Sequence, residues 1–394
     1  MKTRLVYITT TATTANVHLR GQLAYMREHG FDVVVISSPN NELRELEGRE
    51  KVSTIGIPME REISPLKDLL SLVRLYKTLR RLRPAIVNAQ TPKAGLLGMI
   101  AAWAAGVPIR IYVLLGLRLE TTRGLKRFLL SAAERCSAGF AHRVMCISRS
   151  LRQLYVTLGF TAEGKTCIVG KEGSANGLDV NDFVPTSQGA EQARMLRAQV
   201  GIPISVPVIG FVGRFVRDKG VPELLDAFDQ VLRSFPDARL LMLGDFEDGD
   251  PIPESYRKRL CNHPHIVRAG FVTNPAAYYP MMDVLAFPSY REGHGSALLE
   301  AAAAQIPTVA FKATGSVDSL CDGVTGTIVP LGDVDSFARA LQKYLEDEGL
   351  RLKHGRAGRE RVQRVFRREI IWESLYTEYT RLLQTRGRAL CKCQ

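Results

Sequence analysis

The sequence has no apolar run that is long enough to cross a bilayer. Its longest apolar stretch, Leu96–Val107, has about a dozen residues, whereas a membrane-spanning helix needs about twenty. The chain begins with charged residues that lead directly into a strand-like segment, without the apolar core and cleavage site of a secretory signal. These two absences predict a cytoplasmic protein that is either soluble or peripheral on the cytoplasmic face of the membrane.

Acidic residues and paired cysteines are scarce as well. The chain has 40 Asp and Glu residues against 53 Lys and Arg residues, and its net charge of +13 indicates an anionic partner or surface. No array of stacking aromatic residues and no known nucleic-acid-binding module accompanies this charge, so we do not expect nucleic acid as the partner. The seven cysteines lack short paired spacings apart from Cys391 and Cys393, which indicates reduced thiols.

At 394 residues the chain is too long for one ordinary domain, and its 45% apolar and 24% charged residues suit two globular domains. In the first half, short apolar runs alternate with helix-like segments, which predicts an α/β domain with a doubly wound parallel sheet. Ligands bind such sheets outside the carboxyl ends of the strands, so we expect the loops 10–16, 90–93 and 115–122 to line one wall of a cleft. The expected strands are Leu5–Thr9, Asp32–Ser37, Ile55–Ile57, Ala85–Ala89, Ile109–Leu114 and Val144–Ile147, and the long expected helices are Pro65–Arg81 and Lys93–Ala105.

The second half repeats this organisation. A polar segment with proline near both ends, 184–203, predicts a linker, and we place the domain boundary near 185–200. Residues 1–185 and 200–365 are therefore expected to form two domains of the same class, followed by a basic helical tail over 366–394. The expected strands of the second domain are 207–212, 239–243, 266–272, 283–288, 307–311 and 326–329, with helices over 221–233, 275–282 and 333–347.

The first candidate site is a glycine loop between a strand and a helix, within Ser289–Thr308. Ser296 is the expected N-cap of a helix over 297–305. Such a loop lets backbone N–H groups and the positive end of the helix dipole approach an anion closely. Glu292 in the loop and Glu300 on the second helical turn can face the bound group. The alternative interpretation is a solvated helix with a capped start.

The second candidate site is the glycine-rich segment Gly210–Gly220, which also joins a strand to a helix. Arg214 and Lys219 stand five residues apart in this loop. They can place two cations on one diphosphate, arginine as a fork and lysine as a point charge. A surface loop with solvated charges is the alternative.

The two sites together resemble the family-four retaining glycosyltransferases. Glu292 and Glu300 match a Glu-x7-Glu signature, in which the first glutamate contacts the donor sugar and the second contacts the nucleotide ribose. Arg214 and Lys219 match the phosphate-binding loop of the same family, and they precede the glutamate pair in the expected order. The resemblance extends from Leu5 to about Phe366.

The first half resembles the capsular-polysaccharide, CapM-like branch of this family in the segments Met59–Pro65, Thr91–Gly95 and Gly116–Thr121. The resemblance implies the GT-B fold, in which two Rossmann-like domains face each other across a cleft. The acceptor side would lie in the first domain and the nucleotide-sugar site in the second, and the C-terminal helix would return to the first domain.

The resemblance also implies a reaction. It is retaining transfer from a nucleotide-diphosphate sugar, expected to be a UDP-sugar, to a polyprenyl-diphosphate-linked saccharide of capsule, O-antigen or exopolysaccharide. We expect no cofactor, and no metal because no Asp-x-Asp motif of the metal-holding kind is recognised. Two alternatives stay open, namely a catalytically inactive relative that binds a nucleotide-sugar and a sugar epimerase of the same architecture.

Carried over residue by residue, the resemblance assigns three groups of residues. No general base is assigned at Leu115, where many family members carry a histidine. The expected catalytic residues are Glu292, Arg214 and Lys219. The expected donor-binding residues are Gly213, Phe271, Val272, Gly293, His294, Gly295, Ser296, Ala297, Leu298 and Glu300. The acceptor-side candidates are Thr11, Asn16, Thr91, Lys93, Gly116, Arg118 and Asn176.

Basic residues alternate with apolar ones in Leu125–Leu130, and further Lys and Arg residues occur in 74–83 and at Arg135 and Arg143. Such segments suit the surface of an anionic bilayer, so we expect contact with the inner membrane. Solvated helix faces in a basic protein are the alternative.

Overall fold

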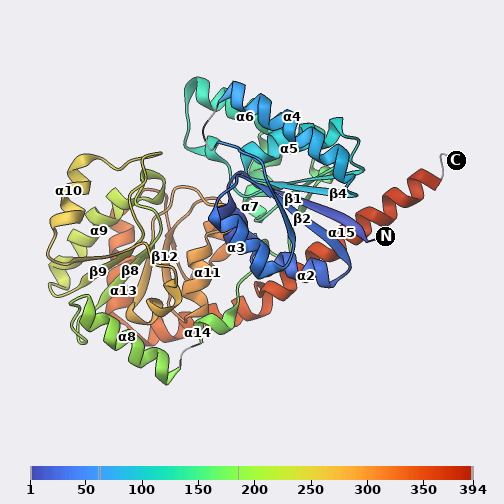
Figure 1. Cartoon of the computed structure of the whole chain (residues 1–394). Coiled ribbons are helices and arrows are strands. Elements are labelled where there is room, and N and C mark those ends of the chain that lie inside the picture. Colours follow the sequence, from blue (N-terminus) through green and yellow to red (C-terminus); the bar gives the residue numbers. More distant parts are fainter. Residues whose placement is uncertain (1, 61, 63, 185, 392–394) are drawn as a thin grey trace. The chain divides into compact units, whose positions relative to one another are not determined.

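The computed structural model describes residues 2–60, 62, 64–184 and 186–391, which form two compact units (Figure 1). Unit 1 comprises Met1–Gly177 and Arg368–Gln394, and unit 2 comprises Leu178–Arg367. Each unit has its own parallel sheet, so the predicted α/β class with two doubly wound sheets is confirmed. No helix of the described residues is long and apolar enough to span a bilayer.

The domain boundary lies at Gly177 and Leu178 rather than near 185–200. The segment that we expected to be a linker contains helix α8 (Ser187–Gln199), whose N-cap Thr186 accepts a hydrogen bond from a backbone N–H of the first turn. Leu196 packs against the core of unit 2, and Arg197 donates to the carbonyl of Met281 at 2.6 Å. These contacts make α8 part of unit 2.

The sheet of unit 1 has the strand order β3-β2-β1-β4-β5-β6-β7, and all its pairings are parallel. Its central strands are rich in Val and Ile and are buried on both faces, as expected for a sheet that helices cover on both sides. The order reverses between the neighbours β1 and β4, which is the topological switch point of this sheet. The strands are β1 Thr3–Ile8, β2 Phe31–Ser37, β3 Ser53–Gly56, β4 Ile86–Gln90, β5 Ile109–Leu114, β6 Arg143–Cys146 and β7 Thr166–Ile168.

One helix of unit 1 lies where we expected the loop 10–16. Thr11 is the N-cap of α1, and its side chain accepts from the backbone N–H of Thr14 at 3.3 Å. This cap satisfies a free donor of the first turn, so the polar segment begins a helix. The α-helices are α1 Ala12–His18, α2 Gln22–Glu28, α3 Asn41–Glu50, α4 Pro65–Leu82, α5 Pro92–Ala104, α6 Gly124–Phe140 and α7 Arg149–Thr157, with short 3-10 turns η1 Arg118–Glu120 and η2 Glu163–Lys165.

The last helix, α15 (Arg368–Cys391), belongs to unit 1, so the predicted return of the C-terminal helix to the first domain is confirmed. Its buried Tyr379 accepts a hydrogen bond from the side chain of Asn88 at 2.6 Å and lies 3.4 Å from the hydroxyl of Tyr7. The indole N–H of Trp372 donates to the side chain of Asn176 at 2.7 Å. The helix therefore completes the core of a domain that begins more than three hundred residues earlier.

A buried carboxyl group lies inside unit 1, at Glu134 of α6. It accepts hydrogen bonds from the hydroxyl groups of Tyr112 and Tyr155, each at 3.1 Å. Burial raises the pKa of Glu134 from 4.5 to about 7, although the two hydrogen bonds lower the pKa. The folded state therefore binds this proton more tightly than the unfolded state does.

This shift predicts that the protein loses stability as pH rises from about 4.5 to about 7, because the folded state must then ionise a buried group. The loss is of the order of 3 kcal/mol in the free energy of unfolding. Glu134→Gln is expected to remove most of this pH dependence. Urea denaturation at pH 5 and pH 8 measures it, with Glu163→Gln, an exposed glutamate of the same unit, as the matched control. The assignment would be contradicted if the free energy of unfolding changed between pH 5 and pH 8 by the same amount in wild type and in Glu134→Gln.

The sheet of unit 2 has the order β10-β9-β8-β11-β12-β13, again with parallel pairings, and its switch point lies between β8 and β11. The strands are β8 Val208–Val212, β9 Arg239–Leu243, β10 Ile266–Gly270, β11 Val284–Phe287, β12 Thr308–Phe311 and β13 Gly326–Val329. Besides α8, the α-helices are α9 Val221–Ser234, α10 Glu254–Asn262, α11 Ser296–Ala303, α12 Ser316–Ser319, α13 Val334–Glu346 and α14 Glu348–Val365. The 3-10 turns are η3 Val180–Phe183, η4 Arg217–Lys219, η5 Pro275–Ala277 and η6 Tyr279–Met281.

Candidate active site

The switch point of unit 2 brings the two sequence motifs together. The loop after β8 carries Lys219, the loop after β11 carries Glu292, and β8 and β11 are neighbours in the sheet. The Lys219 ammonium and the Glu292 carboxylate form an ion pair, although the residues are 73 positions apart. A switch point at the carboxyl edge is where open α/β sheets bind ligands. The structure therefore places the two charged groups where a ligand is expected.

A second ion pair joins the same loops one residue earlier. Asp218 pairs with Arg291, and the Asp218 carbonyl accepts the N–H of Tyr290 at 2.8 Å. The loop after β8 contributes the acid Asp218 and the base Lys219, and the loop after β11 contributes the base and the acid that pair with them. A shift of one loop by one residue would therefore place like charges opposite each other. Gly220 has φ 67°, and a Cβ there would lie 2.0 Å from the carbonyl oxygen of Pro288, so only glycine permits this approach of the loop to β11.

Arg214 lies in the same loop as Lys219 but pairs with a different carboxylate. Its guanidinium contacts Glu247, which lies in the loop after β9. Each cation of this loop thus pairs with a different carboxylate, Lys219 with Glu292 and Arg214 with Glu247. The role of Arg214 stays a prediction.

The helix that carries Glu300 begins differently from our expectation. Gly295 is the N-cap of α11 in a left-handed conformation (φ 67°), and Ser296 is an exposed first helical residue rather than the cap. No side chain of the described residues caps this end. Leu298 is buried in the core and fixes the helix, while Ala297 is half-buried. The N–H groups of the first turn thus lie beside the glycine loop without a side-chain acceptor.

Glu300 lies on the second turn of α11 and has one polar partner that the sequence did not suggest. The hydroxyl of Tyr279 donates to its carboxylate at 2.8 Å. Desolvation raises the pKa of Glu300, and the hydrogen bond from Tyr279 opposes this rise. Tyr279 is itself fully buried, so it holds the carboxylate in one orientation.

His294 was expected to bind the donor, but its ring lies inside unit 2, with only 5% of the residue exposed. The Ser319 hydroxyl donates to the His294 carbonyl, and its oxygen lies 2.9 Å from the ring Nδ1 of His294. Burial lowers the pKa of His294 to about 3, so the ring is neutral, and it packs edge-on against Phe366. Any contact of this residue with a ligand must therefore come from its backbone.

The remaining donor-side residues follow strands of the same sheet. Gly213 ends β8, and its N–H donates to the carbonyl of Leu243 at 2.9 Å. Phe271, which is 80% exposed, and Val272, which packs against the core, follow β10 at the same edge. Gly293 lies between Glu292 and His294 in the loop after β11. Their roles toward a ligand stay predictions.

Two Asp-x-Asp spacings occur in this unit, at 248–250 and 333–335. Asp250 accepts the N–H of Asp218 at 2.8 Å, and Asp333 caps α13 by accepting from Ser336 at 2.9 Å. Both motifs thus have structural partners. Within the described residues, no group of three or more His, Cys, Asp or Glu side chains is placed to hold a metal ion.

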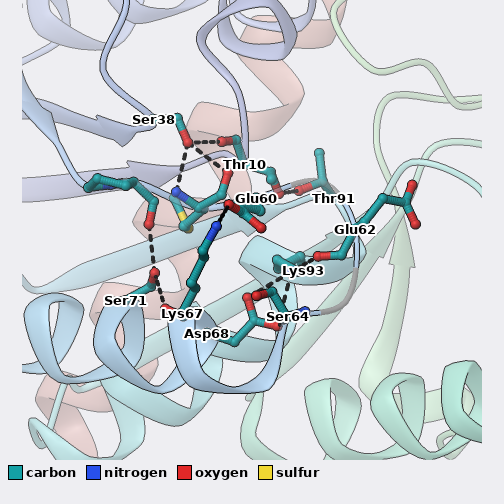
Figure 2. A network of polar contacts seen from close by, with 12 residues as sticks. Thr10, Ser38, Glu60, Glu62, Ser64, Lys67, Asp68, Ser71, Thr91 and Lys93 are labelled. Carbon is teal, nitrogen blue, oxygen red and sulfur yellow. Dashed lines mark hydrogen bonds and ion pairs between the residues drawn. The ribbon is translucent and has the colours of Figure 1, made fainter.

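The switch point of unit 1 carries several acceptor-side candidates (Figure 2). The hydroxyls of Thr10, after β1, and Thr91, after β4, are 2.6 Å apart. Thr91 has φ 71°, a conformation that costs a β-branched residue energy, and Pro92 begins α5 directly after it. Ser38 donates to the Thr10 carbonyl at 2.8 Å and so ties the loop after β2 to the same point.

Several of these candidates have internal partners. Lys93 directs its ammonium at both carboxylate oxygens of Asp68, at 2.7 and 3.0 Å, and at the carbonyl of Glu62 (Figure 2). Its three N–H donors are used, so Lys93 positions the segment before α4 rather than presenting a free cation. The Asn176 side chain donates to the Arg20 carbonyl at 2.9 Å and accepts from Trp372 of α15. Asn176 therefore helps to hold α15 against the rest of unit 1.

The other candidates lie on the loops after β1 and β5. Thr11 caps α1, and Asn16 donates to the carbonyl of Glu42 at 3.1 Å. Gly116 and Arg118 follow β5, where Leu115 packs against the core. Sequence reasoning missed Asp218, Arg291, Glu247 and Tyr279. Of these residues, only Asp218 and Arg291 could have been found from the sequence, because each is a charged residue directly beside a motif residue.

Two Rossmann-like units, a switch-point site and a returning C-terminal helix define the GT-B fold. Solved structures agree on the fold. The Anabaena protein Alr3699/HepE, solved in complex with UDP and glucose, has a TM-score of 0.78 at 18% identity, covering 95% of this chain and 99% of that one. Sucrose-phosphate synthase from Thermosynechococcus elongatus has a TM-score of 0.79 at 20% identity, covering 98% and 100%.

Sequence comparisons give the family. Residues 13–170 match the family described as glycosyl transferase 4-like domain, and residues 193–361 match glycosyl transferases group 1. CapM of Staphylococcus aureus, a capsular polysaccharide biosynthesis glycosyltransferase, is 35% identical over 98% of this chain and 99% of its own length. An Escherichia coli UDP-Gal:alpha-D-GlcNAc-diphosphoundecaprenol alpha-1,3-galactosyltransferase is 26% identical over 74% of each chain. The chain belongs to the family-four, CapM-like glycosyltransferases, as its motifs predicted.

Proposed function

We propose that this glycosyltransferase moves a sugar from a UDP-sugar to a lipid-linked saccharide in capsule, O-antigen or exopolysaccharide synthesis, with retention of configuration. The observation that carries the proposal is the pairing of Lys219 with Glu292 at the switch point of unit 2. The names of two relatives support it. One is a capsular polysaccharide enzyme, and the other names UDP-Gal and a diphosphoundecaprenol-linked sugar.

Donor binding exchanges the partners of the Lys219–Glu292 pair. The diphosphate replaces the Glu292 carboxylate at the Lys219 ammonium, since two phosphates carry more negative charge than one carboxylate. Arg214 leaves Glu247 for the diphosphate in the same way. The Glu292 carboxylate is then released toward the sugar, on the loop that already borders the phosphate site. A ligand without negative charge does not displace either carboxylate from its cation.

Transfer then follows a front-face course. The acceptor oxygen bonds to the anomeric carbon on the face that the diphosphate leaves, and the acceptor proton passes to the departing phosphate oxygen. Lys219 and the backbone N–H groups at the start of α11, which no side chain of the described residues caps, stabilise the negative charge that accumulates there. Glu292 stabilises the positive charge that develops on the sugar ring. Attack and departure on one face give retention.

The full chain, supplied with a panel of nucleotide-sugars and a polyprenyl-diphosphate-linked saccharide, tests this proposal. The expected result is a new glycosidic product whose anomeric configuration, measured by NMR, equals that of the donor. Donor binding without turnover would identify a catalytically inactive relative, and conversion of the donor sugar without transfer would identify an epimerase. Either result overturns the proposal.

Glu300→Gln is expected to weaken UDP binding about tenfold, because a carboxylate that accepts ribose hydroxyls makes charge-assisted hydrogen bonds. Since the pKa of Glu300 is raised, UDP affinity of the wild type should fall on acidification as this carboxylate takes up its proton, and the variant should lack that fall. Calorimetric titration with UDP at several pH values measures both effects, with Glu346→Gln as an exposed control on α13. Wild-type affinity in Glu300→Gln would refute the ribose role.

A further inference from the structure

Large exposed hydrophobic side chains gather on two helices of unit 1. Leu66, at 80% exposed, begins a series that continues along the outer side of α4. On α6, Leu125 is 74% and Phe128 is 67% exposed. Single exposed apolar residues are ordinary, but a group on neighbouring elements indicates an interaction surface. The residues near the start of the two helices, which together with the cations described below we call the apolar-basic face, are Leu66, Leu69, Leu70, Val73, Leu125, Phe128 and Leu129. Tyr76, further along α4, is 38% exposed.

The topology places this set at one edge of the sheet. The helices α4 and α6 both pack against α5, one on each side (Figure 1). All strands are parallel, so every helix begins at the carboxyl edge, and the exposed residues lie in the first turns of α4 and α6. Trp103, exposed at the other end of α5, lies at the opposite edge and is not part of the set. The edge is the one at which Thr10 and Thr91 meet.

Only cations surround these apolar residues on the two helices. The one acid of α4, Asp68, is paired with Lys93, and the one acid of α6, Glu134, is buried. The exposed cations near these residues are Arg74, Arg123, Lys126, Arg127 and Arg135. Lys67 pairs with Glu60, and Lys77, Arg80 and Arg81 lie further along α4, toward the opposite edge. Arg143, which we also expected on this surface, pairs instead with Glu378 at 3.1 Å.

A groove of about 310 Å³ continues the face along α6. Phe128, Leu158 and Phe160 give it apolar walls. Arg127 and Arg135 also line it, and the Arg135 guanidinium lies 5.5 Å from the centre of the Phe160 ring. A groove with apolar walls and two cations fits a lipid headgroup region, where phosphate lies above acyl chain.

We propose that the apolar-basic face docks on an anionic phospholipid bilayer, with its leucine and phenylalanine side chains among the headgroups and its cations at the lipid phosphates. Alternating apolar and basic groups on one face favour such an interface over a protein surface, whose centre is usually depleted of lysine. Docking would hold the carboxyl edge of unit 1 at the membrane. The inference does not depend on the proposed chemistry, since an inactive relative could dock equally.

Co-sedimentation of the full chain with vesicles tests the docking. We expect binding to vesicles of phosphatidylglycerol and phosphatidylcholine, and a partition coefficient at least about tenfold lower with phosphatidylcholine alone. The triple variant Leu66→Ser, Leu125→Ser, Phe128→Ser should lower binding to the anionic vesicles by about tenfold or more. Arg123→Glu with Lys126→Glu should do the same and spares the hydrogen bond that Arg127 donates to the Leu119 carbonyl.

Met195→Ser is the matched control, because Met195 is 60% exposed but lies on α8 of unit 2. It should bind vesicles like the wild type. Retained UDP binding and an unchanged melting temperature show that each variant is folded. Wild-type sedimentation of both face variants would overturn the proposal, as would equal binding to neutral and anionic vesicles. The proposal would also be overturned if analytical ultracentrifugation showed a self-association that the triple variant loses while it keeps its vesicle binding.

Discussion

Replacing Glu292 with glutamine is expected to lower turnover with the full donor by about a hundredfold or more, while UDP affinity stays the same or rises. The loss in rate follows if Glu292 meets the sugar as proposed, because its charge then matters most as the ring becomes positive. The gain in affinity follows because the variant removes the carboxylate that competes with the diphosphate for Lys219. Steady-state kinetics with the full donor and calorimetry with UDP measure the two quantities separately.

Glu346→Gln serves as the control for Glu292→Gln as well, because it removes one carboxylate from an exposed helix of the same unit. The Glu292 assignment would be reversed if Glu292→Gln lost UDP affinity and Glu300→Gln kept it. If neither variant changed binding or rate, the Glu-x7-Glu spacing would be only the start of a helix.

Lys219→Ala is expected to weaken UDP binding by about tenfold to a hundredfold, because a charge-assisted contact to phosphate contributes about 1.5–3 kcal/mol. The affinity for uridine, which has no phosphate, should not change. Lys258→Ala, an exposed lysine on α10, is the matched control. An equal loss for uridine and UDP would show that Lys219 supports the fold of the loop rather than the phosphate.

The double variant Lys219→Ala, Glu292→Gln sharpens this test. Each single variant removes one member of the same ion pair, so their effects on UDP affinity are expected to be non-additive. The second substitution should restore none of the lost phosphate contact. Glu292→Gln removes a carboxylate that competes with UDP for Lys219, but Lys219 is already absent from the double variant. The double variant should therefore bind UDP as Lys219→Ala does.

Local patterns were sufficient for most strands and for the order of the two motifs. The apolar runs at Ile109–Leu114, Arg239–Leu243 and Gly326–Val329 became β5, β9 and β13 with the predicted bounds. Burial on both faces of a parallel sheet leaves a continuous apolar run, and such a run is visible in sequence. The Lys219–Glu292 ion pair was not predicted, although both residues follow strands that we expected in the same domain.

The sequence did not reveal contacts between distant loops or the start of weakly apolar helices. The cap at Thr11 and the helix α8 lie in polar segments, where composition favours a loop and only the capping side chain distinguishes a helix. Glu247 neutralises Arg214 across 33 positions of sequence, and no local pattern reports such a pairing. His294 was predicted to bind the ligand because it lies in the glycine loop. Its place in the sequence does not show that its ring is buried in unit 2.

The place of α15 has a consequence for synthesis of the protein on the ribosome. Unit 2 is continuous in sequence, whereas unit 1 lacks Tyr379 and the rest of α15 until the residues after unit 2 have been synthesised. At about 5–20 residues per second, Tyr7 and Asn88 are synthesised roughly 15 to 75 seconds before the Tyr379 hydroxyl that completes their hydrogen bonds. Unit 2 therefore finishes first. A chain that ends prematurely just beyond Arg367 has a complete unit 2 joined to an unfinished unit 1.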